Sequence, residues 1–360
     1  MSFRTRRVLM GAPFYALISF FVLNYVLSYY TMVNIFQLLF LVLLLFCIQT
    51  LPMLFEEKKS TPIGRFFSKV SGIWQWLLVM LLIYSVVLFI LSFIINIPVL
   101  IVSIILLTIP VIGIYSFFKA HRIVVKEKVL EFENLESEFN IVHLSDVHFG
   151  SIRHKKIIRD LSDKLCELSD SCDLVIISGD LADGSCVVEE DDFIELNRVD
   201  IPIIFTSGNH DYYPGLDCVH RACKKAGIVV LENSGISYDD INVYGLSFSF
   251  DNIDMPSRDE LKSFVVDEKI NIINYHIPNG WEELSDIGFN IQLSGHTHGG
   301  QFYPVVFFGN LMYEGHNMGL FRDSAGHYLH VTTGVGCMDF PMRWGTDSEL
   351  VVLKLRKKKD

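Results

Sequence analysis

Four long apolar stretches dominate the first third of the chain and constrain its fold more than any other feature. They run approximately over residues 8–30, 32–55, 71–95 and 97–118. Each exceeds the roughly 20 residues that a helix needs to cross a bilayer. The segments "FQLLFLVLLLFCIQ" and "LLVMLLIYSVVLFILSFII" carry no charge, whereas buried helices of soluble proteins usually keep a polar stripe. The sequence therefore predicts an all-α membrane region of four transmembrane helices over residues 1–118.

The basic residues near these stretches predict how the chain is oriented in the membrane. They precede the first stretch, follow the second and follow the fourth: Arg4, Arg6 and Arg7; Lys58, Lys59, Arg65 and Lys69; Lys119, Arg122, Lys126 and Lys128. The other two loops, "SYYTM" and "NIP", contain no lysine or arginine. By the positive-inside rule, both termini and all of residues 119–360 are cytoplasmic in a multi-pass protein of the inner (plasma) membrane.

Two further features bear on compartment and partners. "RTRR" before the first stretch allows a cleaved signal peptide, but the run is long and three more follow, which favours a retained span. The formal net charge of −11 lies mostly in the cytoplasmic part, as "VVEEDDFIEL" illustrates. An acidic surface argues against nucleic acid as a partner, because a nucleic-acid binder needs a basic footprint.

Residues 119–360 show a repeated rhythm of short β-branched runs that end in small polar residues. The runs are "FNIVHLSDVHFG", "CDLVIISGDLADG", "IPIIFTSGNHDYY", "INIINYHIP" and "FNIQLSGHTHGG", and the helical pattern "HKKIIRDLSDKLCELS" separates the first two. Later strands are crowded, with no long helices between them. This order predicts an α/β (α+β) domain in which two sheets pack as a β-sandwich flanked by helices.

The loops after these five strands are expected to converge at one edge of the sheets. Together they supply a set of polar side chains: Asp146, His148, Asp180, Asn209, His210, His276, His296 and His298. Any one of them taken alone is ordinary turn chemistry, but five such loops in one domain indicate a site. Imidazole and carboxylate together suit Mn, Fe, Zn or Ni. So many ligands predict two ions that share a carboxylate.

The motifs "DVH", "GDLADG", "GNHD", the lone histidine of "NYHIP" and "GHTHGG" occur in this order and resemble the metal-binding blocks of the calcineurin-like metallophosphoesterases. The resemblance covers about residues 120–355 of the chain. The longer forms "GNHDYY" and "GHTHGGQ" are similar to the bacterial membrane-associated branch, which is related to UDP-diacylglucosamine hydrolases of lipid A biosynthesis.

This resemblance implies a role for each motif residue. Asp146, His148 and His298 would bind the first metal, Asn209, His276 and His296 the second, and Asp180 would bridge them. Two divalent ions are implied, with Mn favoured, and a metal-bound hydroxide would attack phosphorus.

Three other positions have weaker support from the sequence. His210 would stabilise the transition state or protonate the leaving oxygen, with Asp211 as its orienting partner. Arg343 would either clamp a phosphate or form an ordinary surface ion pair. Both readings of Arg343 stay open at this point.

The short distance along the chain between the last span and the first strand narrows the substrate. A domain tethered in this way meets lipid headgroups or lipid-linked nucleotides, so we expect hydrolysis of a lipid-linked phosphate such as UDP-diacylglucosamine or a phospholipid headgroup. A tethered phosphodiesterase or phosphatase of soluble nucleotides or phosphoproteins is the alternative. A non-enzymatic alternative is a metal-dependent membrane sensor or scaffold, although the intact His210 speaks against it.

Overall fold

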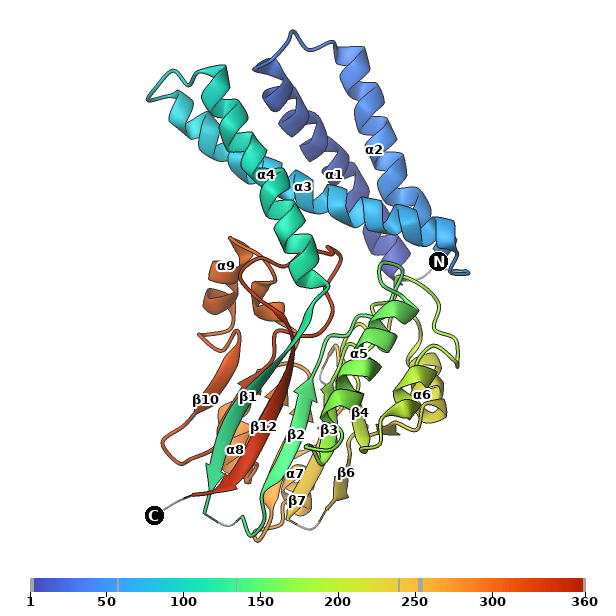
Figure 1. Ribbon diagram of the computed structural model, residues 1–360, viewed down its shortest axis with the longest axis vertical. Coiled ribbons are helices and arrows are strands. Elements are labelled where there is room, and N and C mark those ends of the chain that lie inside the picture. The colour runs from blue at the N-terminus through green and yellow to red at the C-terminus, as the bar shows by residue number, and fades with distance from the viewer. Residues whose placement is uncertain (1–2, 57, 134, 239, 252–254, 359–360) are drawn as a thin grey trace.

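The computed structural model describes residues 3–56, 58–133, 135–238, 240–251 and 255–358, and it places a helical region on one end of an α/β domain (Figure 1). The helical region contains α1 (Phe3–Ser28), α2 (Ile35–Glu56), α3 (Pro62–Ser92) and α4 (Val99–Ala120). The chain runs back and forth, so that the start of α1, the end of α2, the start of α3 and the end of α4 all lie toward the α/β domain (Figure 1). The segments predicted to be cytoplasmic thus lie on the domain's side, as the predicted orientation requires.

Among the described residues, three of these helices are long and apolar enough to cross a membrane, by length and composition. They are α1 over Leu9–Ser28, α3 over Pro62–Ser92 and α4 over Val99–Ala120. The prediction of four spans is therefore corrected to three candidates. The remaining helix, α2, is apolar over the shorter segment Ile35–Leu51 among the residues whose side chains the structure describes.

Helix α3 begins at Pro62, well before the predicted start of its apolar stretch. The Thr61 hydroxyl accepts a hydrogen bond from the Gly64 amide at 3.0 Å, and proline occupies the first turn, where its missing N–H costs nothing. Glu56 in turn accepts from the Thr61 amide at 2.7 Å. The apolar stretch marks the membrane-compatible part of α3, whereas capping fixes where the helix starts.

The α/β domain contains two six-stranded sheets. The first has the order β1-β12-β2-β3-β4-β5: β1 (Ile123–Phe132), β12 (Ser348–Lys357), β2 (Phe139–Leu144), β3 (Leu174–Ser178), β4 (Ile203–Thr206) and β5 (Val229–Val230). The second has the order β10-β11-β9-β8-β7-β6: β10 (Gly319–Arg322), β11 (Tyr328–Val331), β9 (Ile291–Ser294), β8 (Ile270–Tyr275), β7 (Ile241–Leu246) and β6 (Ser234–Ser237).

Helices cover the outer faces of both sheets. They are α5 (Lys155–Leu168), α6 (Leu216–Lys225), α7 (Arg258–Phe264) and α8 (Trp281–Ile287). Helix α9 (Val305–Met312) lies at the end of the domain nearest the helical region, and short 3₁₀ segments lie at Ile194–Arg198 and His298–Gly300. Ile141 and Ile176 of the first sheet share a core with Ile272 of the second. Their strand neighbours Val142 and Ile177 face the opposite way and pack in a separate core with α5, because side chains alternate along a strand. The predicted sandwich flanked by helices is confirmed.

The polar loops gather at one end of this sandwich. Strands β2, β3 and β4 are parallel, as are β7, β8 and β9. Figure 1 shows β2 running toward the helical region, so the loop that follows it lies at the end of the domain nearest α3 and α4.

Candidate metal centre

Five of the predicted ligands have an unusual backbone conformation. Asp146, His148, Asp180, His296 and His298 all have positive φ, at 51°, 51°, 54°, 69° and 52°. Left-handed backbone is uncommon outside glycine and concentrates at functional sites. Left-handed turns, and not the alternation of a strand, therefore bring the Asp146 and His148 side chains together.

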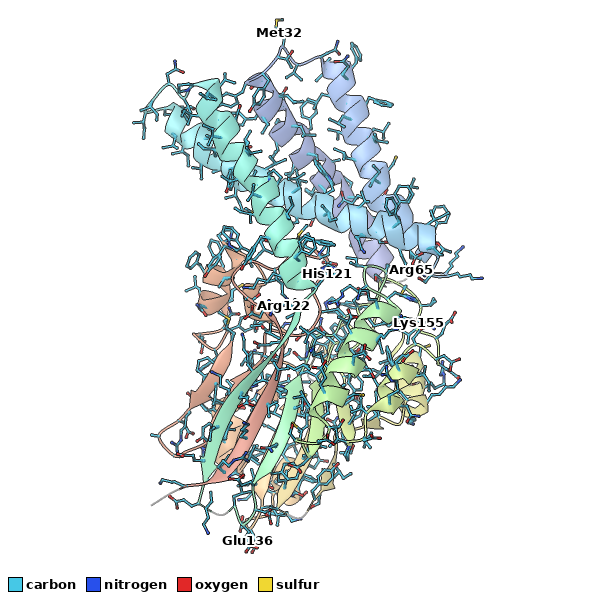
Figure 2. All side chains as sticks on the ribbon, in the orientation of Figure 1. Met32, Arg65, His121, Arg122, Glu136 and Lys155 are labelled. Carbon is cyan, nitrogen blue, oxygen red and sulfur yellow. The ribbon has the colours of Figure 1, made fainter. Side chains whose placement is uncertain are left out.

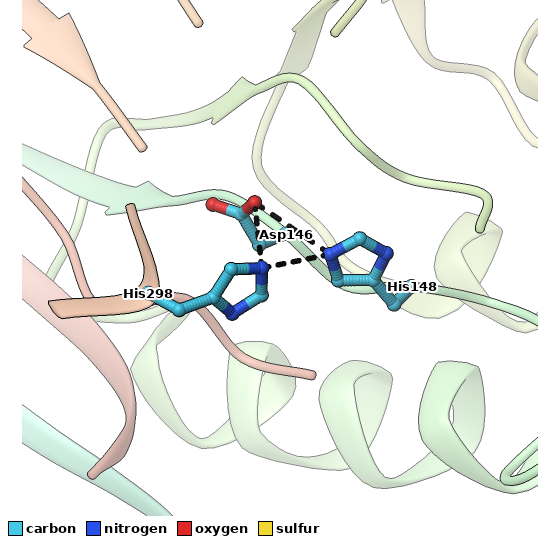
Figure 3. Close-up of side chains that lie close together, drawn as sticks. All are labelled: Asp146, His148 and His298. Atoms are coloured by element: carbon cyan, nitrogen blue, oxygen red, sulfur yellow. Dashed lines mark hydrogen bonds and ion pairs between the residues drawn. The ribbon is translucent and has the colours of Figure 1, made fainter. Parts of the chain in front are cut away.

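Asp146, His148 and His298 form a compact set that we call the buried group (Figure 3). Nε2 of His148 lies 2.9 Å from Nε2 of His298. Asp146 Oδ1 lies 3.3 Å from His298 Nε2 and 3.7 Å from His148 Nε2. One carboxylate oxygen and two imidazole nitrogens thus surround a common point, which is an arrangement suited to a metal ion.

A second set, which we call the open group, consists of Asp180, His276 and His296, together with Asn209, which was predicted to bind the same ion. His276 Nε2 lies 3.2 Å from Asp180 Oδ2 and 3.3 Å from His296 Nδ1. Asn209 Oδ1 is a buried acceptor without a hydrogen-bond partner among the described residues, as expected for an atom kept for a cation. Asp180 Oδ2 is also 3.9 Å from His148 Nε2, so Asp180 stands between the two groups.

The electrostatics of both groups favour a bound cation. Burial lowers the pKa of His296 and that of His298 to about 4, which keeps both rings in the neutral form that metals bind. Burial acts in the same direction on His276, but the Asp180 carboxylate outweighs it and raises the pKa of His276 to about 10. In the absence of an ion, a proton on His276 provides the positive charge beside Asp180. A bound divalent ion would provide that positive charge instead.

Neighbouring groups fix how the open group is presented. His276 Nδ1 is 2.7 Å from the Ser178 carbonyl, so this nitrogen donates and Nε2 stays available as a ligand. A Cβ at Gly208 would collide with the Asp180 carboxylate, and Gly179, at φ +81°, lies against the His276 ring. The glycines of "SGD" and "SGN" therefore allow the two loops to approach the site closely.

His210 lies beside both groups without joining the hydrogen bonds of Asp211. Its backbone amide donates to Asp180 Oδ1 at 2.8 Å, and its Nδ1 is 3.3 Å from the Asp183 carbonyl. The ring is half-buried and packs edge-on against His148 and Tyr213, each at 4.9 Å between centroids. The Asp183 carbonyl is the group that orients the imidazole.

Asp211 holds the loops together, which corrects its predicted role as the orienting partner of His210. Its carboxylate accepts backbone hydrogen bonds from Asp180 at 2.8 Å, Ala182 at 2.9 Å and Gly208 at 2.8 Å. Burial and, next, the charge of Asp180 raise the pKa of Asp211 to about 8, whereas the amide donors lower it.

Arg343 is fully buried, so the expectation of a surface ion pair is wrong. Its Nη2 donates to the carbonyls of Thr333 and Gly336, both at 2.6 Å, and its Nη1 donates to the Thr346 hydroxyl at 3.0 Å. Because these N–H groups already donate to the protein, the guanidinium has no adjacent pair of free N–H groups with which to bind a phosphate. Because Nη2 lies 3.5 Å from His298 Nδ1, Arg343 supports the buried group from behind.

Sequence reasoning gave no role to two further supports. Gln301 directly follows the histidine motif, and this proximity was the available signal. Its Nε2 donates to the Phe340 carbonyl and its Oε1 accepts from the Met338 amide, each at 2.9 Å. His330 pairs through Nδ1 with His143 Nδ1 at 2.6 Å beneath the site, a contact between sheets that no motif signals.

Comparison with known proteins agrees with this geometry. The family model for calcineurin-like phosphoesterases matches residues 139–300, which include all seven predicted ligands. Residues 139–300 are a calcineurin-like phosphoesterase domain. The family predicted from the motifs is thus confirmed.

Several relatives share this phosphoesterase domain. The chain is 31% identical over 243 residues to an uncharacterized metallophosphoesterase of Campylobacter jejuni, covering 65% of this chain and 64% of the relative. It is 31% identical over 217 residues to the uncharacterized protein YpbG of Bacillus subtilis, covering 58% and 80%. It is 27% identical over 239 residues to a Danio rerio transmembrane protein with a metallophosphoesterase domain, covering 60% and 53%. The match therefore spans less than two thirds of the first and third relatives.

Proposed function

We propose that this chain is a membrane-bound, metal-dependent phosphoesterase or pyrophosphatase that hydrolyses a phosphate or pyrophosphate bond in a lipid-linked substrate. The phosphoesterase domain and the two ligand groups support the reaction class. The observation that carries the substrate class is the position of these groups at the end of the domain that packs against α3 and α4.

The contact between the helices and the site is direct. A small cavity of about 10 Å³ is lined by Ala120 and His121 at the end of α4 and also by His148 and Asp183 of the site. On the other side of the contact, the Ser116 carbonyl of α4 accepts a hydrogen bond from the Arg343 amide at 3.0 Å. The last span therefore ends beside a predicted ligand.

An apolar cluster extends this contact to α3. Trp76 and Met80 of α3 and Ile109 of α4 pack with Phe302 and Met342 of the domain. Both domain residues neighbour the site, because Phe302 follows the histidine motif and Met342 precedes Arg343. The helices and the ligand loops thus form one packed unit.

Cationic residues mark the boundary between the two regions. Figure 2 labels Arg65, Arg122 and Lys155 along it, together with His121. Such residues attract anionic lipid headgroups, and by the positive-inside rule this face is the cytoplasmic face of the inner membrane. A phosphate on a lipid in that leaflet, such as UDP-diacylglucosamine or a phospholipid headgroup, would lie within reach of the ligand groups.

Both groups fit divalent ions of the Mn, Fe, Zn and Ni class, and we favour Mn. Asp146, His148 and His298 would hold the first ion, and the second would be held by Asn209, His276 and His296, with Asp180 shared. When bound, two such ions neutralise phosphoryl oxygens and lower the pKa of water.

The chain's own groups then place the substrate and move protons. His210 Nδ1 faces the Asp183 carbonyl, so Nε2 is the nitrogen that would face the substrate and pass a proton to the leaving oxygen. Asp211 keeps the two loops that carry Asp180 and His210 at a fixed separation.

The test measures hydrolysis of UDP-diacylglucosamine and of a chromogenic phosphodiester by the full-length protein, with Mn²⁺ or with chelator. Asp180→Ala is the inactivating variant. Asp163→Ala is the matched control, because Asp163 is an exposed aspartate on α5 that pairs only with Arg198 among the interactions described. Metal-dependent turnover of the lipid that is abolished by Asp180→Ala alone supports the proposal.

Two other results would overturn the proposed substrate class. Turnover of the chromogenic diester alone would favour a tethered phosphodiesterase or phosphatase of soluble nucleotides or phosphoproteins. An absence of turnover with every metal, together with an unchanged biological role in His210→Ala, would favour a membrane sensor or scaffold.

A further inference from the structure

Helix α9 exposes an apolar face to its surroundings. Its sequence, "VVFFGNLM", contains no charged residue. Phe307 is 68% exposed, Phe308 61%, Leu311 81% and Met312 73%. Residues at this spacing share one side of a helix, and a contiguous exposed apolar patch of this kind marks an interaction site.

The opposite side of α9 is fixed to the domain. Val306 is 4% exposed, and Gly309 approaches the domain so closely that a Cβ there would lie 2.6 Å from the Asn317 side chain. The helix cannot roll to bury its four large residues without losing this packing. Their exposure is therefore a property of the folded domain.

The position of α9 identifies what covers this face. Figure 1 shows α9 at the end of the domain nearest the helical region, and Figure 2 shows it level with the labelled His121 and Arg122, just beyond the end of α4. Phe302, shortly before α9, belongs to the apolar cluster that contacts α3 and α4. Tyr303 and Trp344 pack edge-on at 5.4 Å beside it, and such aromatic pairs favour the membrane interface.

We propose that α9 is an interfacial helix that inserts Phe307, Phe308, Leu311 and Met312 into the leaflet in which α4 ends. The partner of this face is the lipid bilayer. An interfacial helix buries its large apolar side chains at the headgroup–acyl boundary, and the clustered contacts of Phe302 continue the surface that already meets the spans. A second copy of the chain would have to displace lipid to reach the same face.

The insertion bears on the ligand groups because α9 is connected to them on both sides. It begins shortly after His298, and the ring of Tyr313, just past its end, is 6.3 Å from the ring of His296. The Thr297 hydroxyl donates to the carbonyl of Asn317 at 2.6 Å, and Gly309 rests on the same asparagine. The depth of α9 thus sets the height of the open group above the lipid. That consequence rests on the proposed lipid-linked substrate, whereas the insertion itself does not.

The insertion is tested by photo-crosslinking in the full-length protein reconstituted into nanodiscs of phosphatidylethanolamine and phosphatidylglycerol. Benzoylphenylalanine replaces Phe308 in one sample and Val129 in the control, a 55% exposed apolar residue on β1 of the same domain. We expect phospholipid adducts at position 308 and none at position 129. An absence of lipid adducts at 308, or crosslinked dimers in their place, would overturn the inference whether or not any lipid substrate is hydrolysed.

A kinetic experiment tests the consequence for turnover. Phe307→Glu combined with Leu311→Glu should lower kcat/KM for UDP-diacylglucosamine in nanodiscs by about tenfold or more. Turnover of the chromogenic diester should stay within about twofold, because surface substitutions perturb the fold little; Val129→Glu should change neither rate. Undiminished lipid turnover in the double variant would refute the role of α9 while leaving the proposed function intact. An absence of lipid turnover in the unaltered protein would refute the proposed function and leave α9 to the crosslinking result.

Discussion

The buried group and the open group share one carboxylate but differ in access. Asp146, His148 and His298 are 0%, 5% and 3% exposed, and Asp180 and His276 are 1% and 0% exposed, whereas Asn209 and His296 of the open group are half-buried. The buried group is held from behind by Arg343 and lies near the end of α4. We infer that the buried group anchors the centre and that substrate approaches the open one. Four predictions test this difference.

The largest effect is expected for Asp180, the carboxylate that stands between the groups. Asp180→Ala should release both ions and lower kcat/KM by about 10⁴-fold or more, because several kcal/mol of charge stabilisation are lost and each 1.4 kcal/mol is tenfold. Metal content by mass spectrometry and steady-state kinetics measure the two effects. Retention of one full equivalent of metal would show that Asp180 belongs to one group only.

Removal of one histidine from each group should separate anchoring from access. His148→Ala and His296→Ala should each release one ion and lower activity by about 10³-fold. His148→Ala should also lower the Tm by at least about 3 °C more than His296→Ala. The reason is that it removes one polar partner of the buried side chains of Asp146 and His298. Equal melting temperatures in differential scanning fluorimetry would contradict the division into an anchoring and an accessible group.

His210 should affect chemistry without affecting metal. Its contact with Asp180 is made by the backbone amide, which His210→Ala retains. We expect kcat to fall by about 10²-fold with unchanged metal content, as for loss of a general acid. Loss of an ion in this variant would mean that His210 is a ligand, which the grouping of His148, Asp180 and His210 within 4.8 Å also allows.

The smallest effect is expected for Arg343, whose guanidinium contacts His298 of the buried group. Arg343→Lys keeps the charge but loses the planar fork that serves several carbonyls. Metal affinity should fall by about tenfold, as is typical of groups that orient ligands. A titration that monitors metal binding directly should show the loss at the buried group first. An unchanged affinity for both ions would show that Arg343 does not support the ligands of the buried group.

The sequence was sufficient for the layers of the fold and for the identities of the ligand candidates. Charge-free stretches of about 20 residues predicted the helical region, because a helix of that length and composition suits a bilayer, although only three of the four stretches are candidate spans among the described residues. Alternating β-branched runs predicted the sandwich. The run that forms α9 was missed, because a short run of eight uncharged, mostly apolar residues has no periodicity that separates helix from strand.

The arrangement within the site depends on which loops pack together, and a linear pattern does not contain this information. The "DVH" motif indicated that Asp146 and His148 act together, but their left-handed backbone was not predictable from it. Asp211 lies next to His210 in sequence, yet its carboxylate bonds to amides of two loops. Arg343 was separated from His298 by 45 positions, so only the fold reveals their contact.

The measurement that tests the central claim most directly is the rate of UDP-diacylglucosamine hydrolysis by the full-length protein in vesicles as the substrate's mole fraction changes at constant bulk concentration. An active site that takes its substrate from the bilayer should give a rate that rises with mole fraction, requires added metal and is absent in Asp180→Ala. A rate that depends on bulk concentration alone, or an equal rate for a water-soluble analogue, would contradict a site that receives its phosphate from the membrane.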